Sequence, residues 1–154
     1  MPLLNVAPIE ATVDIAAPPA KVWALVSDLR NMARWSPQVV RTFVKAPVAE
    51  GSTMFNINRR KLLVWPTQAK VVRFLPEQEI AFRVKENFTV WSYELEPTES
   101  GGTRVTARRE APQGISDLSV GLTKRALGGV DRFTAELQDG LRQTLQKIKV
   151  DAER

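Results

Sequence analysis

The chain has 154 residues, of which 44% are hydrophobic, and this length and composition fit one compact domain, which we assign to residues 1–154. Cysteine and histidine are both absent, which excludes disulfides, thiol nucleophiles, zinc sites with Cys or His ligands and catalytic triads that need imidazole. Lysine and arginine outnumber aspartate and glutamate by 22 to 17, but the basic residues are scattered among acids, so we interpret them as a solvated surface rather than a nucleic-acid site.

The first residues, Met1 to Val6, contain neither a positively charged region nor a long apolar stretch. No segment of the chain approaches the roughly 18 consecutive apolar residues that a membrane-spanning helix needs. We therefore expect a cytoplasmic protein with no stable membrane insertion, a location that the missing cysteines permit. We expect it to be a monomer or a weak homodimer.

The N-terminal third begins with a strand and continues into two short helices. Apolar and polar residues alternate from Ile9 to Ile15, which predicts a strand with one buried face. After Pro18-Pro19, apolar residues recur at helical spacing and predict a short helix that ends near Asp28. Asp28 or Asn31 can cap a second brief helical turn, which Pro37 ends.

Beyond Pro37, short apolar and polar alternations separated by turn residues predict an antiparallel meander. We place its strands at 39–45, 53–59, 67–74, 79–85, 88–96 and 103–110. The break at 60–66 is unusual because Leu62 to Trp65 are apolar where a turn is normally polar. These residues form either an apolar rim of a pocket or the continuation of a long strand pair, and the sequence leaves both open.

After Pro112 the apolar spacing becomes helical. A long amphipathic C-terminal helix is predicted by the residues that share one face, Val130, Phe133, Leu137, Leu141, Leu145 and Ile148. The preceding segment, 115–126, also has helical spacing, but Gly128-Gly129 interrupts it. We expect either a static kink at these glycines or a movable lid before them.

The order of elements predicts an α+β fold. In this fold a curved seven-stranded antiparallel sheet wraps around the C-terminal helix, and two short helices follow the first strand. A single helix, about 10 Å wide, does not fill a strongly curved sheet. The remaining space is filled by large side chains or kept as a ligand cavity.

Several sequence motifs are similar to those of a known superfamily. They include Ile15-Ala16-Ala17-Pro18, Trp35-Ser36-Pro37-Gln38-Val39, Trp91-Ser92-Tyr93-Glu94-Leu95 and Gly102-Thr103-Arg104-Val105-Thr106. With these motifs the chain resembles the START-like, Bet v 1-like (SRPBCC) helix-grip superfamily, and in particular its bacterial polyketide cyclase/dehydrase-like proteins. The resemblance spans nearly the whole chain and implies the helix-grip fold. Because the superfamily contains carriers, cyclases and other components, it implies no single chemistry.

The candidate cavity residues follow from strand alternation. If the odd positions of the first strand face the helix, Phe55, Ile57 and Arg59 share the inward face of the third strand, with Arg59 at the cavity mouth or reaching into water. A guanidinium at the mouth can hold a carboxylate or a carbonyl of a ligand. The same alternation on the other strands, with loop and helix residues added, predicts a cavity lined by Trp35, Phe55, Ile57, Arg59, Trp65, Ile80, Phe82, Trp91, Tyr93, Arg109 and Leu122.

We expect this cavity to bind a small apolar molecule, lipid-like or polyketide-like, as a carrier or sensor. The sequence motifs predict no cofactor, no metal and no catalytic residue. The alternative is a polyketide aromatase/cyclase or dehydratase in which Tyr93 donates a proton and Arg59 orients the substrate. A module that binds nucleic acid or protein through its basic surface is a third interpretation, which the scattered charges disfavour.

Overall fold

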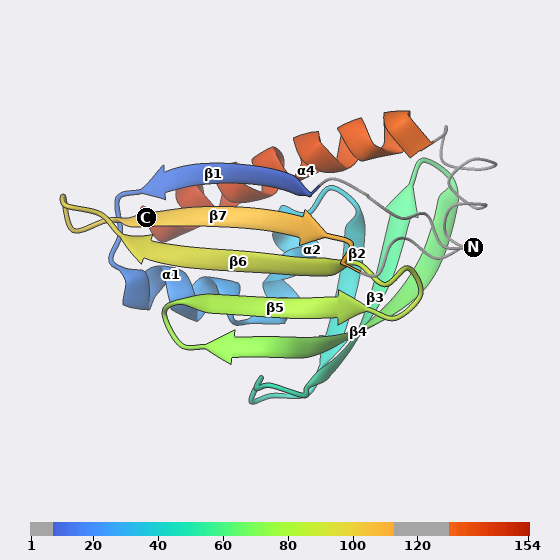
Figure 1. The fold of residues 1–154 in the computed structure, drawn as a ribbon, viewed down its shortest axis with the longest axis horizontal. Helices are drawn as coiled ribbons and strands as arrows, with labels where there is room; N and C mark the ends of the chain where they lie inside the picture. The colour runs from blue at the N-terminus through green and yellow to red at the C-terminus, as the bar shows by residue number, and fades with distance from the viewer. Residues whose placement is uncertain (1–7, 113–129) are drawn as a thin grey trace.

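The computed structural model of the protein describes residues 8–112 and 130–154, and its elements follow the predicted order (Figure 1). The elements are β1 Ile9–Ile15, α1 Pro19–Val26, the 3-10 helix η1 Leu29–Asn31, α2 Met32–Trp35, β2 Val39–Val44, β3 Thr53–Arg60, β4 Leu63–Leu75, β5 Glu79–Val84, β6 Val90–Pro97, β7 Thr103–Glu110 and α4 Val130–Ala152.

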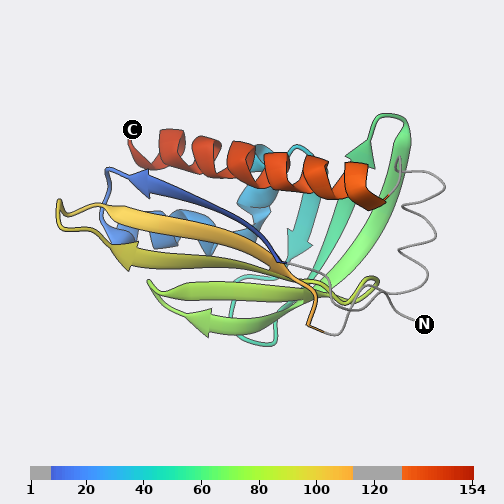
Figure 2. The same cartoon turned by 45° about the horizontal axis from the view of Figure 1, so that its top comes forward.

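The seven strands form one antiparallel sheet in the order β1-β7-β6-β5-β4-β3-β2. Neighbouring strands along the chain pair with each other, except that β1 closes against β7, and β1 and β2 are the two edges. The sheet curves, and α4 lies on its concave side along β1, with α1 and α2 beneath one half of the helix (Figures 1 and 2). This is the predicted α+β helix-grip architecture.

The short helices form where the sequence places start and stop signals. Pro19 stands in the first turn of α1, where its missing N–H is not needed. The carboxylate of Asp28 accepts a hydrogen bond from the backbone N–H of Arg30 and so caps η1. Trp35 ends α2, two residues before Pro37. The predicted second helical turn is thus present as η1 followed by α2.

The β3–β4 hairpin corrects the predicted break at 60–66. Only Lys61 and Leu62 separate the two strands, and Lys61 adopts a φ of 55° in the turn. Leu62 is 93% exposed at its tip. The apolar residues after it continue the strand because each pairs with β3, as Val64 does with Arg59. Of the two sequence interpretations, the long strand pair is therefore correct.

The hydrophobic core lies between the concave face and α4. On the helix, Leu141, Leu145 and Ile148 are buried as predicted, whereas Leu137 is only half-buried. The side chains of Val130 and Phe133 lie outside the described part of the chain. So do the predicted break at Gly128-Gly129, the helical segment 115–126 and the predicted cavity residue Leu122.

Two contacts fix the direction of α4 along β1. The side-chain amide of Gln138 donates to the backbone carbonyl of Glu10 at 2.6 Å. Further along the helix, the ammonium of Lys149 donates to the backbone carbonyl of Asp14 at 3.0 Å. The first half of α4 therefore lies beside the start of β1, and its second half lies beside the end of β1.

Candidate functional site

Residues of β5, β6 and β7 share the concave face in register. Phe82 of β5 pairs with Trp91 of β6, and Trp91 pairs with Arg109 of β7. Two residues along, Ile80 pairs with Tyr93. Ile80, Phe82 and Tyr93 belong to the buried core, and Trp91 packs against it. These five predicted residues are therefore brought together on one face of the sheet.

The predicted face of β3 is wrong by one residue. Met54, Asn56 and Asn58 are the buried residues of this strand, whereas Phe55 is 38% exposed on the opposite face. Ile57 shares that outer face because a strand alternates with a period of two. The predicted inward positions of Phe55, Ile57 and Arg59 are thus corrected to outward ones.

The error in β3 arises because its buried positions carry polar side chains. The hydroxyl of Thr42 donates to Oδ1 of Asn56 at 2.7 Å, and Nδ2 of Asn58 donates to Oγ1 of Thr67 at 3.0 Å. These bonds satisfy amides that would otherwise be costly to bury. Where apolar and polar residues alternate, the apolar set normally faces inward. In β3 the apolar Phe55 faces outward, so this rule predicts the wrong face.

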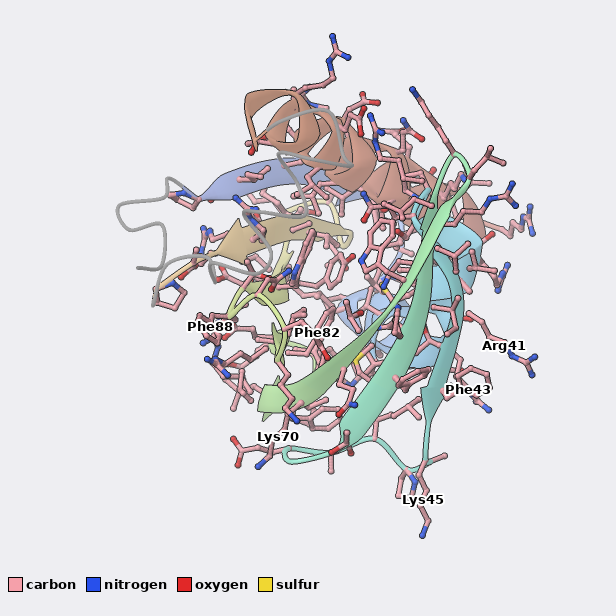
Figure 3. The ribbon with its side chains drawn as sticks, turned by 90° about the vertical axis from the view of Figure 1, so that its right-hand side faces the viewer. Arg41, Phe43, Lys45, Lys70, Phe82 and Phe88 are labelled. Atoms are coloured by element: carbon pink, nitrogen blue, oxygen red, sulfur yellow. The ribbon has the colours of Figure 1, made fainter. Side chains whose placement is uncertain are left out.

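On the outer face of the sheet, aromatic and basic side chains of β2 and β3 contact one another. The rings of Phe43 and Phe55 lie 6.2 Å apart, and the guanidinium of Arg41 lies 4.8 Å from the centre of the Phe43 ring. Arg59 donates from Nε to the backbone carbonyl of Lys61 at 2.8 Å. Figure 3 shows Arg41 and Phe43 pointing away from the concave face, into which Phe82 points.

We call the region between the concave face and α4 the interior, and its two ends differ in packing. One end, the Trp35 end, lies under the second half of α4 and against α1 and α2. Its side chains have almost no exposure, and they include Val22, Val26, Leu29, Val105, Leu145 and Ile148. The other end, the Arg109 end, lies under the first half of α4. Its side chains are only half-buried at Ala11, Leu63, Trp65, Thr67, Trp91 and Leu137.

Trp35 and Tyr93 lie in the well-packed part of the interior. Trp35 is 1% exposed, and its indole N–H donates to Oδ2 of Asp151 on α4 at 2.8 Å. The Tyr93 hydroxyl donates to the sulfur of Met32 at 3.6 Å, and burial raises the pKa of this phenol. Both side chains are almost fully covered by other parts of the fold.

The Arg109 end is closed on one side by an ion pair that the sequence did not predict. Arg60 of β3 donates from Nε and Nη2 to the two carboxylate oxygens of Glu136 on α4, at 2.7 and 2.6 Å. The guanidinium holds the pKa of Glu136 below its ordinary value. If the two faces of β3 had been assigned correctly, Arg60 would have been predicted to face inward. Its partner lies 76 residues away in the chain, and no local pattern indicates it.

Arg109 differs from the other arginines of its strand. Arg104 and Arg108 point outward from β7 and pair with Asp14 and Glu10 of β1, at 2.8 and 2.7 Å. Arg109 points inward, is only 4% exposed, and its Nε and Nη2 atoms have no hydrogen-bond partner in the part of the chain that the structure describes. Burial lowers the pKa of this guanidinium.

A separate open cleft of about 610 Å³ lies at the free edge of β2. It is lined by Arg30, Ala33, Arg41, Thr42, Phe43, Val44, Lys45 and Thr53. No predicted cavity residue within the described ranges lines it. The cleft is shallow and exposed, so it is poorly shaped to enclose a ligand.

The described residues limit the chemistry of the interior. Within 8–112 and 130–154, no group of three or more acidic side chains is placed to hold a metal ion. None of the helices in those ranges is long and apolar enough to cross a membrane. At the Arg109 end the notable groups are half-buried indoles, satisfied polar side chains and one guanidinium. This set is suited to binding an apolar molecule with a polar end.

Comparison with known proteins places this geometry in context. A family model described as "Polyketide cyclase / dehydrase and lipid transport" matches residues 7–151. No curated protein sequence matches the chain significantly.

Solved structures of related shape share little sequence with the chain. The di-domain ARO/CYC proteins StfQ, from the steffimycin biosynthetic pathway, and BexL, from the BE-7585A pathway, superpose on 95% and 96% of it. Their TM-scores are 0.75 and 0.71, at 16% and 20% identity. The chain spans half the length of each. Protein CV1439 from Chromobacterium violaceum superposes on 97% of the chain and is itself 99% covered, with a TM-score of 0.70 at 15% identity. These likenesses establish the fold.

Proposed function

Because the chain belongs to the family of polyketide cyclases/dehydrases and lipid-transport proteins, we propose that it binds one small, largely apolar molecule in its interior, as a carrier or sensor. The observation that supports this proposal is the contrast between the two ends of the interior. Side chains at the Trp35 end are fully packed, whereas Trp65, Trp91 and Leu137 at the Arg109 end keep exposed apolar surface. Apolar surface on a concave face gains free energy when a ligand removes it from water.

The side chains at the Arg109 end suit a ligand with a flat or extended apolar body. Trp65 and Trp91 offer large rigid surfaces, and Phe82 of β5 points into the interior (Figure 3). The indole N–H of Trp91 already donates to the hydroxyl of Thr89 at 3.0 Å. Because this donor is satisfied within the protein, the ring contributes its apolar face to the ligand.

Binding without catalysis is the function that the described residues support best. The enzymatic alternative needs Tyr93 and Arg59 to act on one substrate, but these residues lie on opposite faces of the sheet. In addition, burial raises the pKa of Tyr93, and its hydroxyl is engaged with Met32. The hypothesis that Tyr93 and Arg59 act together on one substrate is therefore wrong. A carrier, in contrast, needs no proton transfer.

A neutral fluorescent probe tests the proposal. N-phenyl-1-naphthylamine should bind at one saturable site per chain, because its two aromatic groups match the half-buried indoles. Phe82→Trp adds volume inside the interior and should weaken binding several-fold, whereas Phe55→Trp makes the same change on the outer face and should leave it unaltered. Thermal unfolding of both variants checks that each of them folds. The absence of saturable binding, or equal weakening in the two variants, would overturn the proposal.

A further inference from the structure

The buried guanidinium of Arg109 has two donors on the concave face that no described residue accepts from. It stands on β7 between Trp91 of β6 and Ile9 of β1, with which it is in register. Nine-tenths and more of the residue is buried, yet Nε and Nη2 find no acceptor among the residues that the structure describes. Buried polar groups of native proteins are almost always hydrogen-bonded, and buried charges are paired. This exception therefore calls for an acceptor that the described residues do not supply.

The two unpartnered atoms are the pair that binds carboxylates elsewhere in this molecule. Arg60 uses Nε and Nη2 to hold both oxygens of Glu136. Arg104 uses the same two atoms to hold both oxygens of Asp14, at 2.8 and 3.3 Å. These nitrogens point their N–H bonds in parallel along one edge of the guanidinium, which matches the spacing of carboxylate oxygens. The free edge of Arg109 is thus shaped for a carboxylate.

The charges of the described residues in the interior predict how many negative charges the ligand carries. The inward-facing Arg60 is already neutralised by Glu136, so this pair adds no net charge. Arg109 then contributes one positive charge that no described carboxylate offsets. A single carboxylate neutralises it, whereas a dianionic phosphate would leave a buried negative charge, which is costly to desolvate.

Resting on the proposed function, we infer that the ligand of the interior is an apolar monocarboxylic acid whose carboxylate is bound by Nε and Nη2 of Arg109. Its apolar body lies against Trp91 and Phe82, which are the neighbours of Arg109 across β6 and β5. The guanidinium selects the head group, and the aromatic surface supplies most of the apolar contact. Acids differing in their apolar part are therefore expected to share the requirement for Arg109.

A matched pair of ligands separates this inference from the proposed function. Dodecanoic acid and 1-dodecanol have the same chain and differ in the head group, and each is measured by displacement of N-phenyl-1-naphthylamine from the full chain. The preference for the acid is defined as the dissociation constant of 1-dodecanol divided by that of dodecanoic acid. Since hydrogen bonds to charged groups are strong, the wild-type preference for the acid should exceed that of Arg109→Met by at least about tenfold. Binding of 1-dodecanol should change much less than binding of the acid, because the alcohol carries no charge.

Arg104→Met provides the matched control. It removes one positive charge from the same strand but on the outer face, where Arg104 pairs with Asp14, so it should keep the wild-type preference. If Arg109→Met fails to fold, Arg109→Lys gives the same test. It keeps the charge but loses the parallel pair of donors, so it should lower the preference.

The outcomes are distinguishable. If the acid and the alcohol bind the wild type equally, or if both Arg109 variants keep the preference, the inference is overturned while the proposed function stands. If neither ligand nor the fluorescent probe binds, the proposed function fails as well. A preference that is lost with Arg109 and kept in Arg104→Met supports the inference.

Discussion

Arg60 on β3 and Glu136 on α4 form two hydrogen bonds, 2.7 and 2.6 Å long, that join the β3–β4 hairpin to the first half of the helix. This pair lies at the Arg109 end of the interior, where the apolar side chains are least covered. It therefore joins the β3–β4 hairpin to α4 at the end of the interior where we propose that the ligand binds.

The pair should make stability depend on pH. Arg60 lowers the pKa of Glu136 below its ordinary 4.5 in the folded state. A carboxylate with a depressed folded pKa contributes stability above its unfolded pKa and loses it as the pH falls through the folded value. Glu136→Gln should therefore lower the free energy of unfolding at pH 7 and have a smaller effect at pH 3. Urea unfolding of both proteins at the two pH values measures this, and an equal effect at both would contradict it.

Leu141 and Leu137 should differ in their contribution to stability. Leu141 is 4% exposed against the sheet, whereas Leu137, one helical turn earlier, is half-buried. Leu141→Ala should lower the free energy of unfolding by about 2 to 5 kcal/mol through lost burial and the cavity left behind. Leu137→Ala, the matched control, should cost clearly less. Equal losses in urea unfolding would show that the two ends of the interior are packed alike.

The unliganded protein should gain stability when Arg109 is replaced by methionine. The change removes a buried charge without a described partner and keeps a side chain of similar length. Replacing such a charge by an apolar group is expected to raise the free energy of unfolding by about 1 kcal/mol or more. Urea unfolding in the absence of ligand measures the change. A clear loss of stability would mean that the charge is satisfied within the fold.

The sequence predicts the bounds of a strand best where alternation is unbroken or where clear turn residues flank the strand. The bounds of β1 and β7 agree with the predicted 9–15 and 103–110, because hydrophobic and polar residues alternate without interruption in β1 and clear turn residues flank β7. β4 begins at Leu63 and not at the predicted residue 67. The prediction started too late because Pro66 is typical of a turn. Pro66 instead pairs in register with Ile57, and the strand runs through it.

The site could be predicted only in part because its contacts are distant in the chain. Strand alternation correctly turned Trp91 and Arg109 inward. The same reasoning failed in β3, where the polar Asn58 is buried by hydrogen bonding. Trp35 was predicted to line the cavity, but it is 1% exposed at the well-packed end of the interior, where its indole N–H donates to Asp151, 116 residues away. No pattern along the chain indicates such a distant partner, nor that Arg109 finds none among the described residues.

The most direct test of the proposed binding site uses the four tryptophans as reporters. Trp65 and Trp91 lie half-buried at the Arg109 end, Trp35 lies at the other end under α4, and Trp23 packs edge-on against Phe74, 5.3 Å between ring centres. Each gives one indole N–H signal in a 15N–1H NMR spectrum, which is assigned by replacing each tryptophan with phenylalanine. On titration with dodecanoic acid, the signals of Trp65 and Trp91 should shift to saturation while those of Trp23 and Trp35 stay in place. Saturable binding that shifts only Trp23 or Trp35, or none of the four, would contradict a ligand site at the Arg109 end of the interior.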